Sequence, residues 1–306
     1  MRVLFAGTPV VAVPSLDALV AAGFDVVAVL TRPDAPLGRK RVLTPSPVAV
    51  RAAELGLPVI RAARLDAAAI ASIEAVQPDI AGIVAYGGIV PPSALTVPRF
   101  GWVNLHFSLL PAWRGAAPVQ RSIIAGDDIT GAVTFQLEAG LDTGPIFGTL
   151  TETVGAADTS GELLARLSHS GAVLLAQTLS AIDAGRAAPQ AQSGEISLAP
   201  KLTLEDGQLD WRQPALAIGR RARGVSPEPG AWTLLAGQRI KLAPPALRPD
   251  VTGLGPGTVE LHGKSVLVGT GSHAVELTQI QPAGKKMMAA ADWARGVASL
   301  ESVVFE

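Results

Sequence analysis

The chain has 306 residues, of which 48% are hydrophobic and 17% charged, and its formal net charge is −1. A chain of this length favours two domains, and this composition predicts a compact globular protein rather than a disordered one. The lack of cysteine excludes disulfides and thiolate metal sites, and the lack of a signal-peptide pattern or a bilayer-length apolar run predicts a cytoplasmic protein without a membrane partner.

Short apolar runs and amphipathic segments alternate along the first part of the chain. Strands are predicted at residues 2–6, 25–31, 58–62 and 79–86, and helices at residues 15–22, 48–56 and 66–76. Apolar strands that alternate with such helices are typical of a parallel sheet covered on both faces. Residues 1–189 are therefore predicted to form a doubly wound α/β domain with a mostly parallel, Rossmann-like sheet. The first strand-to-helix turn, AGTPVV, lacks the Gly-x-Gly-x-x-Gly spacing, which argues against a dinucleotide-dependent oxidoreductase.

The pattern changes after residue 189. Residues 190–205, which are polar and contain proline, are predicted to be a linker. A helix is predicted at residues 214–225, and short alternating apolar runs follow, separated by glycine and proline turns. Strands at such spacing are typical of a small β-barrel or sandwich, so residues 206–306 are predicted to form a second, all-β domain.

Two polar residues share one short strand in the first domain. The run NLHFSLLP is mostly apolar, but Asn104 and His106 alternate along a strand that starts at Trp102, and they therefore point to the same face. An amide and an imidazole on one face can both donate hydrogen bonds to an oxygen that gains negative charge. Open α/β sheets bind ligands beyond the carboxyl ends of their strands, and this run is predicted to lie at such an end.

A carboxylate follows in a glycine-flanked turn. Asp142, in the run GLDTG, comes after a strand predicted at residues 132–139, and we expect it to approach His106, favour the imidazolium and orient the ring. Taken alone, His106 is better explained as a satisfied polar residue at a strand end, and Asp142 as a turn former. Together with Asn104 they predict a catalytic site.

Missing motifs argue against two kinds of chemistry. There is no Gly-x-Ser-x-Gly nucleophile elbow, which argues against hydrolysis through an acyl-enzyme. The four histidines are dispersed and lack metal-ligand spacing, so no metal is expected. Direct transfer remains, in which an external nucleophile attacks a bound carbonyl and the site stabilises the tetrahedral oxyanion.

The runs NLHFSLLPAWRGAAPVQRSIIAGD and GLDTG resemble the core of the tetrahydrofolate-dependent formyltransferases. Further runs are similar to the members of this family that act on tRNA, and they follow in the expected order: FAGTP, RPDAPLGR, PSPV, AYGGIVP, SLLPAWRGAAPVQ, DTSGELL and QPAGKK. The resemblance implies a monomeric enzyme of translation initiation that uses no metal. It implies formyl transfer from 10-formyltetrahydrofolate to the α-amino group of initiator methionyl-tRNA.

The resemblance also implies roles for individual positions. Asn104, His106 and Asp142 correspond to the catalytic triad. Two loops correspond to folate-binding segments: Ser108, Leu109, Leu110 and Pro111 in one, and Val84, Ala85, Tyr86 and Gly87 in the other. Packing at a strand end explains Tyr86, the only tyrosine, equally well, because family members need only the backbone there.

Basic residues are implied to contact the tRNA. The loop at residues 32–47 is similar to one that enters the acceptor stem, and Arg39 corresponds to its functional arginine. Few apolar residues anchor this loop, so we expect it to be mobile without a partner. The other implied phosphate contacts are Lys40, Arg41, Arg220, Arg221, Arg223, Lys285 and Lys286. The second domain is implied to be an OB-like barrel, a common scaffold for nucleic-acid contact. A merely solvated charged face is the competing explanation for these residues.

Other functions share parts of this pattern. A folate-dependent enzyme acting on a sugar amine or a glycinamide ribotide would keep the triad, but it would not need the basic loop or the second domain. A formylfolate-hydrolase module of a larger dehydrogenase would need a reactive cysteine, which this chain lacks. A non-catalytic RNA-binding module would leave Asn104, His106 and Asp142 unexplained.

Overall fold

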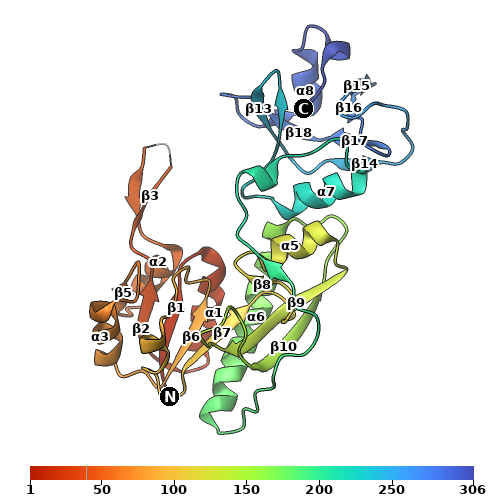
Figure 1. Ribbon diagram of the computed structural model, residues 1–306. Coiled ribbons are helices and arrows are strands. Elements are labelled where there is room, and N and C mark those ends of the chain that lie inside the picture. Colours follow the sequence, from red (N-terminus) through yellow and green to blue (C-terminus); the bar gives the residue numbers. More distant parts are fainter. Residues whose placement is uncertain (39) are drawn as a thin grey trace. The chain divides into compact units, whose positions relative to one another are not determined.

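The computed structural model describes residues 1–38 and 40–306 (Figure 1). Two units can be distinguished, each built from several stretches of the chain. The first comprises Met1–Pro118, Ile129–Thr153 and Leu164–Ala199, and the second comprises Val119–Asp128, Val154–Leu163 and Pro200–Glu306. Residues 190–199 of the predicted linker therefore belong to the first unit, and residues 200–205 to the second.

A seven-stranded sheet is the centre of the first unit, with the strand order β10-β9-β7-β6-β1-β2-β5. Its strands are β1 (Arg2–Gly7), β2 (Asp25–Thr31), β5 (Val59–Arg61), β6 (Ile80–Val84), β7 (Trp102–His106), β9 (Ile129–Gln136) and β10 (Ile146–Thr153). The strands from β5 to β7 run parallel, whereas β9 is antiparallel to both of its neighbours. This confirms the predicted doubly wound, mostly parallel sheet. The chain order of the strands reverses between β1 and β6, and in such sheets this reversal marks the crevice where ligands bind.

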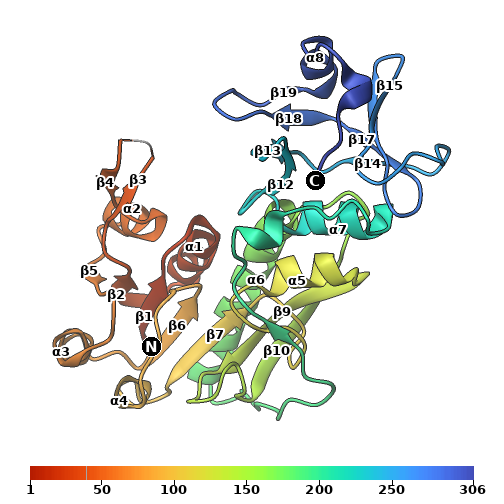
Figure 2. The same cartoon turned by 45° about the horizontal axis from the view of Figure 1, so that its top comes forward.

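Helices cover both faces of this sheet (Figure 2). They are α1 (Val13–Ala21), α2 (Pro47–Glu54), α3 (Ala67–Ala75), α4 (Pro92–Leu95) and the greater part of α6 (Ser160–Asp183). Leu19 of α1 and Leu175 of α6 meet one face at Gly82 of β6. On the other face, the indole nitrogen of Trp102 donates a hydrogen bond of 2.8 Å to the carbonyl of Ala94 in α4. The sheet is thus buried on both sides, which explains why its strands are almost continuously apolar.

Local signals start two of these helices. The side chains of Ser46 and Asp66 accept hydrogen bonds from the backbone N–H groups of Ala49 and Ala69, as N-cap residues do. Pro47 then occupies the first position of α2, where its missing N–H has no cost. Ser46 and Pro47 therefore determine where α2 begins, directly after the loop predicted at residues 32–47.

The loop predicted at residues 32–47 contains regular structure. β3 (Ala35–Leu37) and β4 (Val42–Thr44) form an antiparallel pair, which we call the basic hairpin. Lys40 and Arg41 between these strands are exposed, and so are the apolar side chains of Leu37, Val42 and Leu43. Arg39 lies outside the described residues. The expectation of a plain loop is corrected, because strand pairing satisfies backbone groups that an open loop would leave to water.

The second unit holds two four-stranded sheets. One contains β12 (Ala231–Leu235), β13 (Gln238–Leu242), β18 (Gln279–Gln281) and β19 (Met288–Ala289), and the other contains β14 (Ala246–Arg248), β17 (Ala274–Leu277), β16 (Ser265–Val268) and β15 (Val259–His262). Its helices include α5 (Pro118–Ala125), which is almost wholly in this unit, α7 (Ala215–Gly224) and α8 (Ala290–Arg295). The pairs within both sheets are antiparallel.

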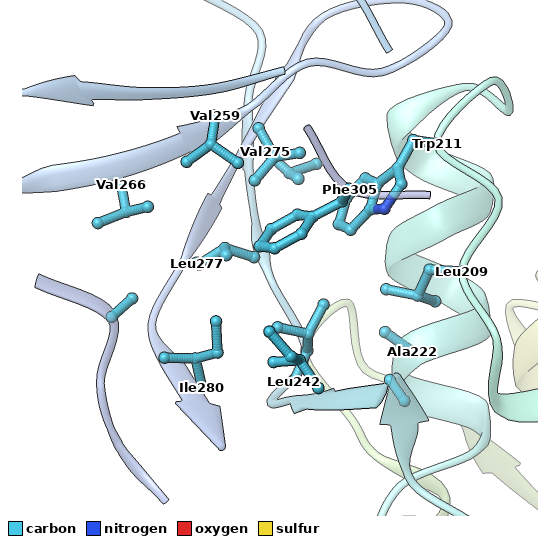
Figure 3. Close-up of a cluster of buried hydrophobic side chains, with 14 of the residues drawn as sticks. Leu209, Trp211, Ala222, Leu242, Val259, Val266, Val275, Leu277, Ile280 and Phe305 are labelled. Carbon is cyan, nitrogen blue, oxygen red and sulfur yellow. The ribbon is translucent and has the colours of Figure 1, made fainter. Parts of the chain in front are cut away.

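Aromatic stacking organises the core of this unit (Figure 3). Phe305 stacks against Trp211 and Trp293, with ring centroids 5.8 Å and 5.9 Å apart. Side chains from both sheets, including Ile280 and Val275, belong to the same buried cluster. This small β-rich unit confirms the class predicted for the C-terminal part of the chain. Among the described residues, no helix combines the length and the hydropathy needed to cross a membrane.

Candidate active site

His106 is the last residue of β7 and Asn104 is its middle residue, with β6 on one side of the strand and β9 on the other. Asn104 is paired in register with Ile83 of β6 and Phe135 of β9. It is the only asparagine of the chain, it is half-buried, and its amide makes no hydrogen bond to another described residue. A half-buried amide usually has a partner. The Asn104 amide is therefore available to a ligand at this edge of the sheet.

His106 is buried, with 6% of its surface exposed, and the edge of its ring faces Phe135. Its Nε2 lies 2.9 Å from the carbonyl oxygen of Trp113. Because a carbonyl can only accept, Nε2 carries the hydrogen, and in the neutral ring Nδ1 is the bare nitrogen. Nδ1 lies 3.8 Å from Oδ2 of Asp142, so two members of the predicted triad lie close together.

Burial decides the charge of this histidine. It lowers the pKa of His106 from its ordinary 6.5, and this effect outweighs the nearby Asp142 carboxylate and the hydrogen bond to Trp113, which both raise the pKa. Asp142 favours the imidazolium, as the sequence led us to expect, but in the resting protein burial outweighs it. The ring is neutral at neutral pH because desolvation of a buried cation costs more than one carboxylate at 3.8 Å restores.

A backbone N–H group holds the carboxylate of Asp142. Its backbone is left-handed, with a φ of 48°, which an aspartate tolerates better than most residues. Its Oδ2 accepts a hydrogen bond of 2.7 Å from the backbone N–H of Gly115. The carboxylate therefore keeps one fixed position opposite Nδ1 of His106, even while the histidine is neutral.

Sequence reasoning missed the segment that holds these groups. Trp113, which supplies the carbonyl to His106, also has a left-handed φ of 61°. Its backbone N–H donates a hydrogen bond of 2.9 Å to Oγ of Ser197. The run AWRG, which contains Trp113 and Gly115, was visible as part of a motif, but no local pattern marks Ser197 because its partner is 84 residues away. Contacts of that kind appear only in the folded chain.

The first predicted folate segment, residues 84–87, begins where β6 ends. Ala85 and Gly87 have left-handed φ angles of 47° and 80°, which end the strand and turn their peptide groups away from the ladder. Tyr86 is only 2% exposed and donates its hydroxyl hydrogen to the carbonyl of Ala62 at 2.8 Å. Its own carbonyl accepts a hydrogen bond from Thr8. The packing explanation of the Tyr86 ring therefore agrees with its burial, whereas Ala85 and Gly87 present backbone at the edge.

The second predicted folate segment, Ser108 to Pro111, follows His106 directly. Ser108 is buried, and its hydroxyl donates a hydrogen bond of 2.6 Å to the carbonyl of Ala112. Leu110 is buried against Val133 and Phe135, while Leu109 is half-buried. The two segments leave adjacent parallel strands at the same sheet edge: the first leaves β6, and the second leaves β7, the strand that carries Asn104.

The basic residues predicted to contact tRNA differ in exposure and in the hydrogen bonds that they make within the protein. Lys40 and Arg41 in the basic hairpin and Lys285 and Lys286 in the second unit are exposed. Arg221 and Arg223 of α7 are half-buried, and they donate to the backbone carbonyls of Asp206 at 3.1 Å and Asp158 at 3.0 Å. Arg220 and Arg223 line a cavity of about 470 Å³ in the second unit, together with Asp127 and Asp128. The arginines of α7 therefore serve the packing of their own unit as well as any ligand.

No cluster of three or more histidine, aspartate or glutamate side chains that could hold a metal ion occurs in residues 1–38 or 40–306.

Comparison with known proteins gives the family. A family model described as formyl transferase matches residues 1–179, more than half of the chain. The chain belongs to the formyl transferase family. A second model, described as the C-terminal domain of formyl transferase, matches residues 201–298. The family that the sequence motifs predicted is thereby confirmed.

Individual formyl transferases resemble the chain in sequence or in fold. The methionyl-tRNA formyltransferase of Pseudarthrobacter chlorophenolicus is 78% identical over 306 residues, which is 100% of both chains. The crystal structure of an N-formyltransferase from Helicobacter canadensis with folinic acid and dTDP-3-aminofucose has a TM-score of 0.69 at 17% identity, covering 90% of this chain and 98% of its own. Methionyl-tRNA formyltransferase from Clostridium thermocellum has a TM-score of 0.56 at 16% identity, covering 81% and 94%. At these identities the two solved structures show a common formyl transferase fold and no more.

The depressed pKa of His106 makes stability depend on pH. In the unfolded chain the pKa of His106 returns to about 6.5, so just below that pH the unfolded chain binds more protons than the folded protein does. This part of the stability is present above the unfolded pKa and is lost as the pH falls through it. We expect the free energy of unfolding of the wild type to fall faster than that of His106→Gln between about pH 8 and pH 5, by at most ~1.4 kcal/mol per pH unit. Urea unfolding at several pH values measures this, and parallel curves for the two proteins would contradict it.

Proposed function

We propose that this formyl transferase moves the formyl group of 10-formyltetrahydrofolate to the α-amino group of methionyl initiator tRNA, as a monomer in the cytoplasm. The observation that carries the proposal is β7, where Asn104 lies two residues before a buried, neutral His106 that faces Asp142. The Asn104 amide makes no hydrogen bond within residues 1–38 and 40–306. The choice of acceptor is supported by the full-length relative that is 78% identical and is called a methionyl-tRNA formyltransferase.

Asn104 acts on the oxygen of the formyl group. As the amine attacks the formyl carbon, the carbonyl oxygen gains negative charge and a tetrahedral centre forms. The Asn104 amide donates a hydrogen bond to that oxyanion, and it can do so because no described protein group occupies it. A preorganised donor of this kind stabilises the transition state more than the bound substrate.

His106 takes the proton that the attacking amine must lose. Its bare Nδ1 is the acceptor, and the imidazolium that results is stabilised by the Asp142 carboxylate 3.8 Å away. A positive charge therefore appears beside the site only when the oxyanion is present, which adds to the stabilisation by Asn104. The proton then passes to the folate nitrogen as its bond to the formyl carbon breaks, and tetrahydrofolate leaves.

The folate donor is proposed to lie along residues 84–87 and 108–111. Both segments leave the carboxyl edge of the sheet next to the strand-order reversal, where doubly wound sheets bind their ligands. Ala85 and Gly87 have left-handed backbones, so their peptide groups point away from the strand pairing of the sheet. These backbone groups are proposed to hydrogen-bond the edge of the heteroaromatic ring of folate. The Tyr86 ring is assigned to the core because its hydroxyl already has a partner.

The acceptor is proposed to be tRNA rather than a sugar amine, although the fold is shared with an N-formyltransferase whose structure contains dTDP-3-aminofucose. Exposed Lys40 and Arg41 on the basic hairpin, with Arg39 from the sequence resemblance, suit contact with a phosphate backbone. Exposed Lys285 and Lys286 in the second unit suit the same role, whereas Arg220, Arg221 and Arg223 are proposed to contribute less because they also serve their own unit.

The decisive assay compares acceptors. With 10-formyltetrahydrofolate as donor, formyl transfer is measured to charged initiator tRNA, to free methionine and to a nucleotide-linked amino sugar. We expect efficient transfer to the tRNA alone. Preferred transfer to the amino sugar would replace the proposed acceptor while keeping the chemistry, and transfer to none of the three would reject the proposed function.

Removing the Asn104 amide should impair the chemical step. We expect Asn104→Ala to lower kcat by roughly 10²–10³, the usual cost of one oxyanion donor, with little change in the KM for folate. Asn104→Asp keeps the shape but places an acceptor where a donor is needed, so it should be at least as slow. Single-turnover kinetics and thermal unfolding of both variants make the measurement, and near-normal turnover in a folded Asn104→Ala protein would remove Asn104 from the mechanism.

The basic hairpin should act through phosphate contacts. We expect Lys40→Ala and Arg41→Ala to lower kcat/KM for charged tRNA more at low salt than at high salt, and to reduce the salt slope by about one per lost contact. Arg186→Ala is the matched control, because Arg186 is an exposed cation of the same unit outside the hairpin. If all three variants behave alike at both salt concentrations, the hairpin charges are only a solvated face.

A further inference from the structure

The sequence predicted residues 190–199 as part of a linker. In the structure this segment is hydrogen-bonded to two loops, the one that carries Asp142 and the one that carries Trp113 and Gly115. At its start, the backbone of Gln190 exchanges two hydrogen bonds with Ile146, at 2.7 Å and 2.8 Å. At its end, β11 (Leu198–Ala199) pairs in parallel with β8 (Arg114–Gly115). Ile146 follows the turn of Asp142, and Arg114 follows Trp113. We call residues 190–199 the strap.

Gln192 is the strap side chain that bonds to both loops at once. Its Nε2 donates to the carbonyl of Asp142 at 2.7 Å and to the carbonyl of Gly144 at 2.9 Å. Its Oε1 accepts from Nη2 of Arg114 at 2.6 Å and from Nε of Arg114 at 3.2 Å. Both amide hydrogens and both acceptor positions of the side chain are therefore used.

Gln192 and Gly115 restrain Asp142 through two different groups of that residue. The Asp142 turn is held from its backbone by Gln192 and from its carboxylate by the N–H of Gly115. Gly115 directly follows Arg114, so the amide of Gln192 ties together the residue that carries the carboxylate and the loop that aims it. A left-handed backbone at Asp142 needs such restraint, because that conformation costs energy for a residue other than glycine.

The chemistry of the side chain is specific to an amide. Two backbone carbonyls require two N–H donors, and a guanidinium requires an acceptor, and glutamine offers both from one terminal group. A glutamate would still accept from Arg114, but it would set a carboxylate oxygen against the carbonyls of Asp142 and Gly144. An alanine would leave those carbonyls and the Arg114 guanidinium without this partner.

We infer that Gln192 is a positioning residue for catalysis, which holds the Asp142 carboxylate opposite Nδ1 of His106 by bonding the Asp142 turn to Arg114. Through Gln192, the strap then supports the active site and is not only a connection to the second unit. The kinetic part of this inference rests on the proposed function, whereas the positioning itself is a property of the protein without substrate.

The test that needs no substrate is the NMR titration of the His106 ring. The Asp142 carboxylate raises the pKa of His106, so moving it away should lower that pKa further. We expect a lower pKa in Gln192→Ala and in Gln192→Glu than in the wild type. Gln190→Ala is the matched control, since Gln190 lies in the same strap, has an exposed side chain and bonds through its backbone. It should leave the pKa unchanged.

A double substitution separates positioning from general loosening of the loops. If Gln192 acts through the carboxylate, Gln192→Ala should shift the His106 pKa when Asp142 is present and should cause no further shift when Asp142→Asn has already been made. An unchanged or raised pKa in Gln192→Ala, or the same shift in both backgrounds, would overturn the inference. Thermal unfolding of each variant shows that the titrated protein is folded, and Gln192→Glu supplies the comparison if the alanine variant is not.

Kinetics give the second readout. We expect Gln192→Ala to lower kcat for charged tRNA by roughly 10- to 100-fold with little change in KM, because a misplaced catalytic group costs rate rather than binding. Gln190→Ala should keep wild-type turnover. A wild type that does not formylate tRNA would reject the proposed function and leave the titration as the test of positioning. An active wild type with an equally active Gln192→Ala would reject the inference alone.

Discussion

His106 sits at the end of β7 with its ring almost wholly removed from water, and a buried ring N–H must find an acceptor within the protein. The carbonyl of Trp113 is that acceptor, and this single hydrogen bond sets the tautomer and leaves Nδ1 bare toward Asp142. The loop after β7 must therefore return so that Trp113 lies beside the strand it has just left. The left-handed backbone of Trp113 and its bond to Ser197 are the local consequences of that requirement.

A histidine beside a carboxylate can be a permanent ion pair or a neutral ring that gains charge during a reaction, and burial decides between these two roles. An exposed pair would be an ion pair at rest, and its charge would act on substrate and transition state alike. In this site the desolvation of the ring outweighs the carboxylate, so the ring is neutral at rest, and in the proposed reaction its charge arises only when it takes the proton of the amine. Asp142 is then valuable because it is already in place, held by Gly115 and by the strap, and does not have to move when the imidazolium forms.

The sheet explains why these loops meet. β6 and β7 are parallel neighbours, so the segments after Val84 and after His106 leave from one edge, next to the reversal of strand order. β9 runs antiparallel to β7, so its last residue, Gln136, pairs with Val103 near the start of β7. The turn that carries Asp142 therefore folds back along the sheet to come within 3.8 Å of His106. The topology therefore assembles the site from segments that are distant in the sequence, and the strap closes it from residues more distant still.

The sequence by itself determined the fold class, the alternation of strands and helices and the family, because periodicity and a run of motif residues are local properties. It also proposed the three catalytic residues, of which His106 and Asp142 lie 3.8 Å apart. It also placed Asn104 and His106 on one face, since alternation along a strand needs no knowledge of neighbours.

The tertiary structure alone decided the charge of His106, since desolvation depends on everything packed around the ring. It likewise decided that Tyr86 is a core residue, and that the described part of the basic loop is a hairpin. Gln192 and Ser197 look like ordinary polar residues of a linker, and their partners are 48 or more residues away. Only folding brings such groups within hydrogen-bonding distance, so no local pattern in the sequence could have marked them.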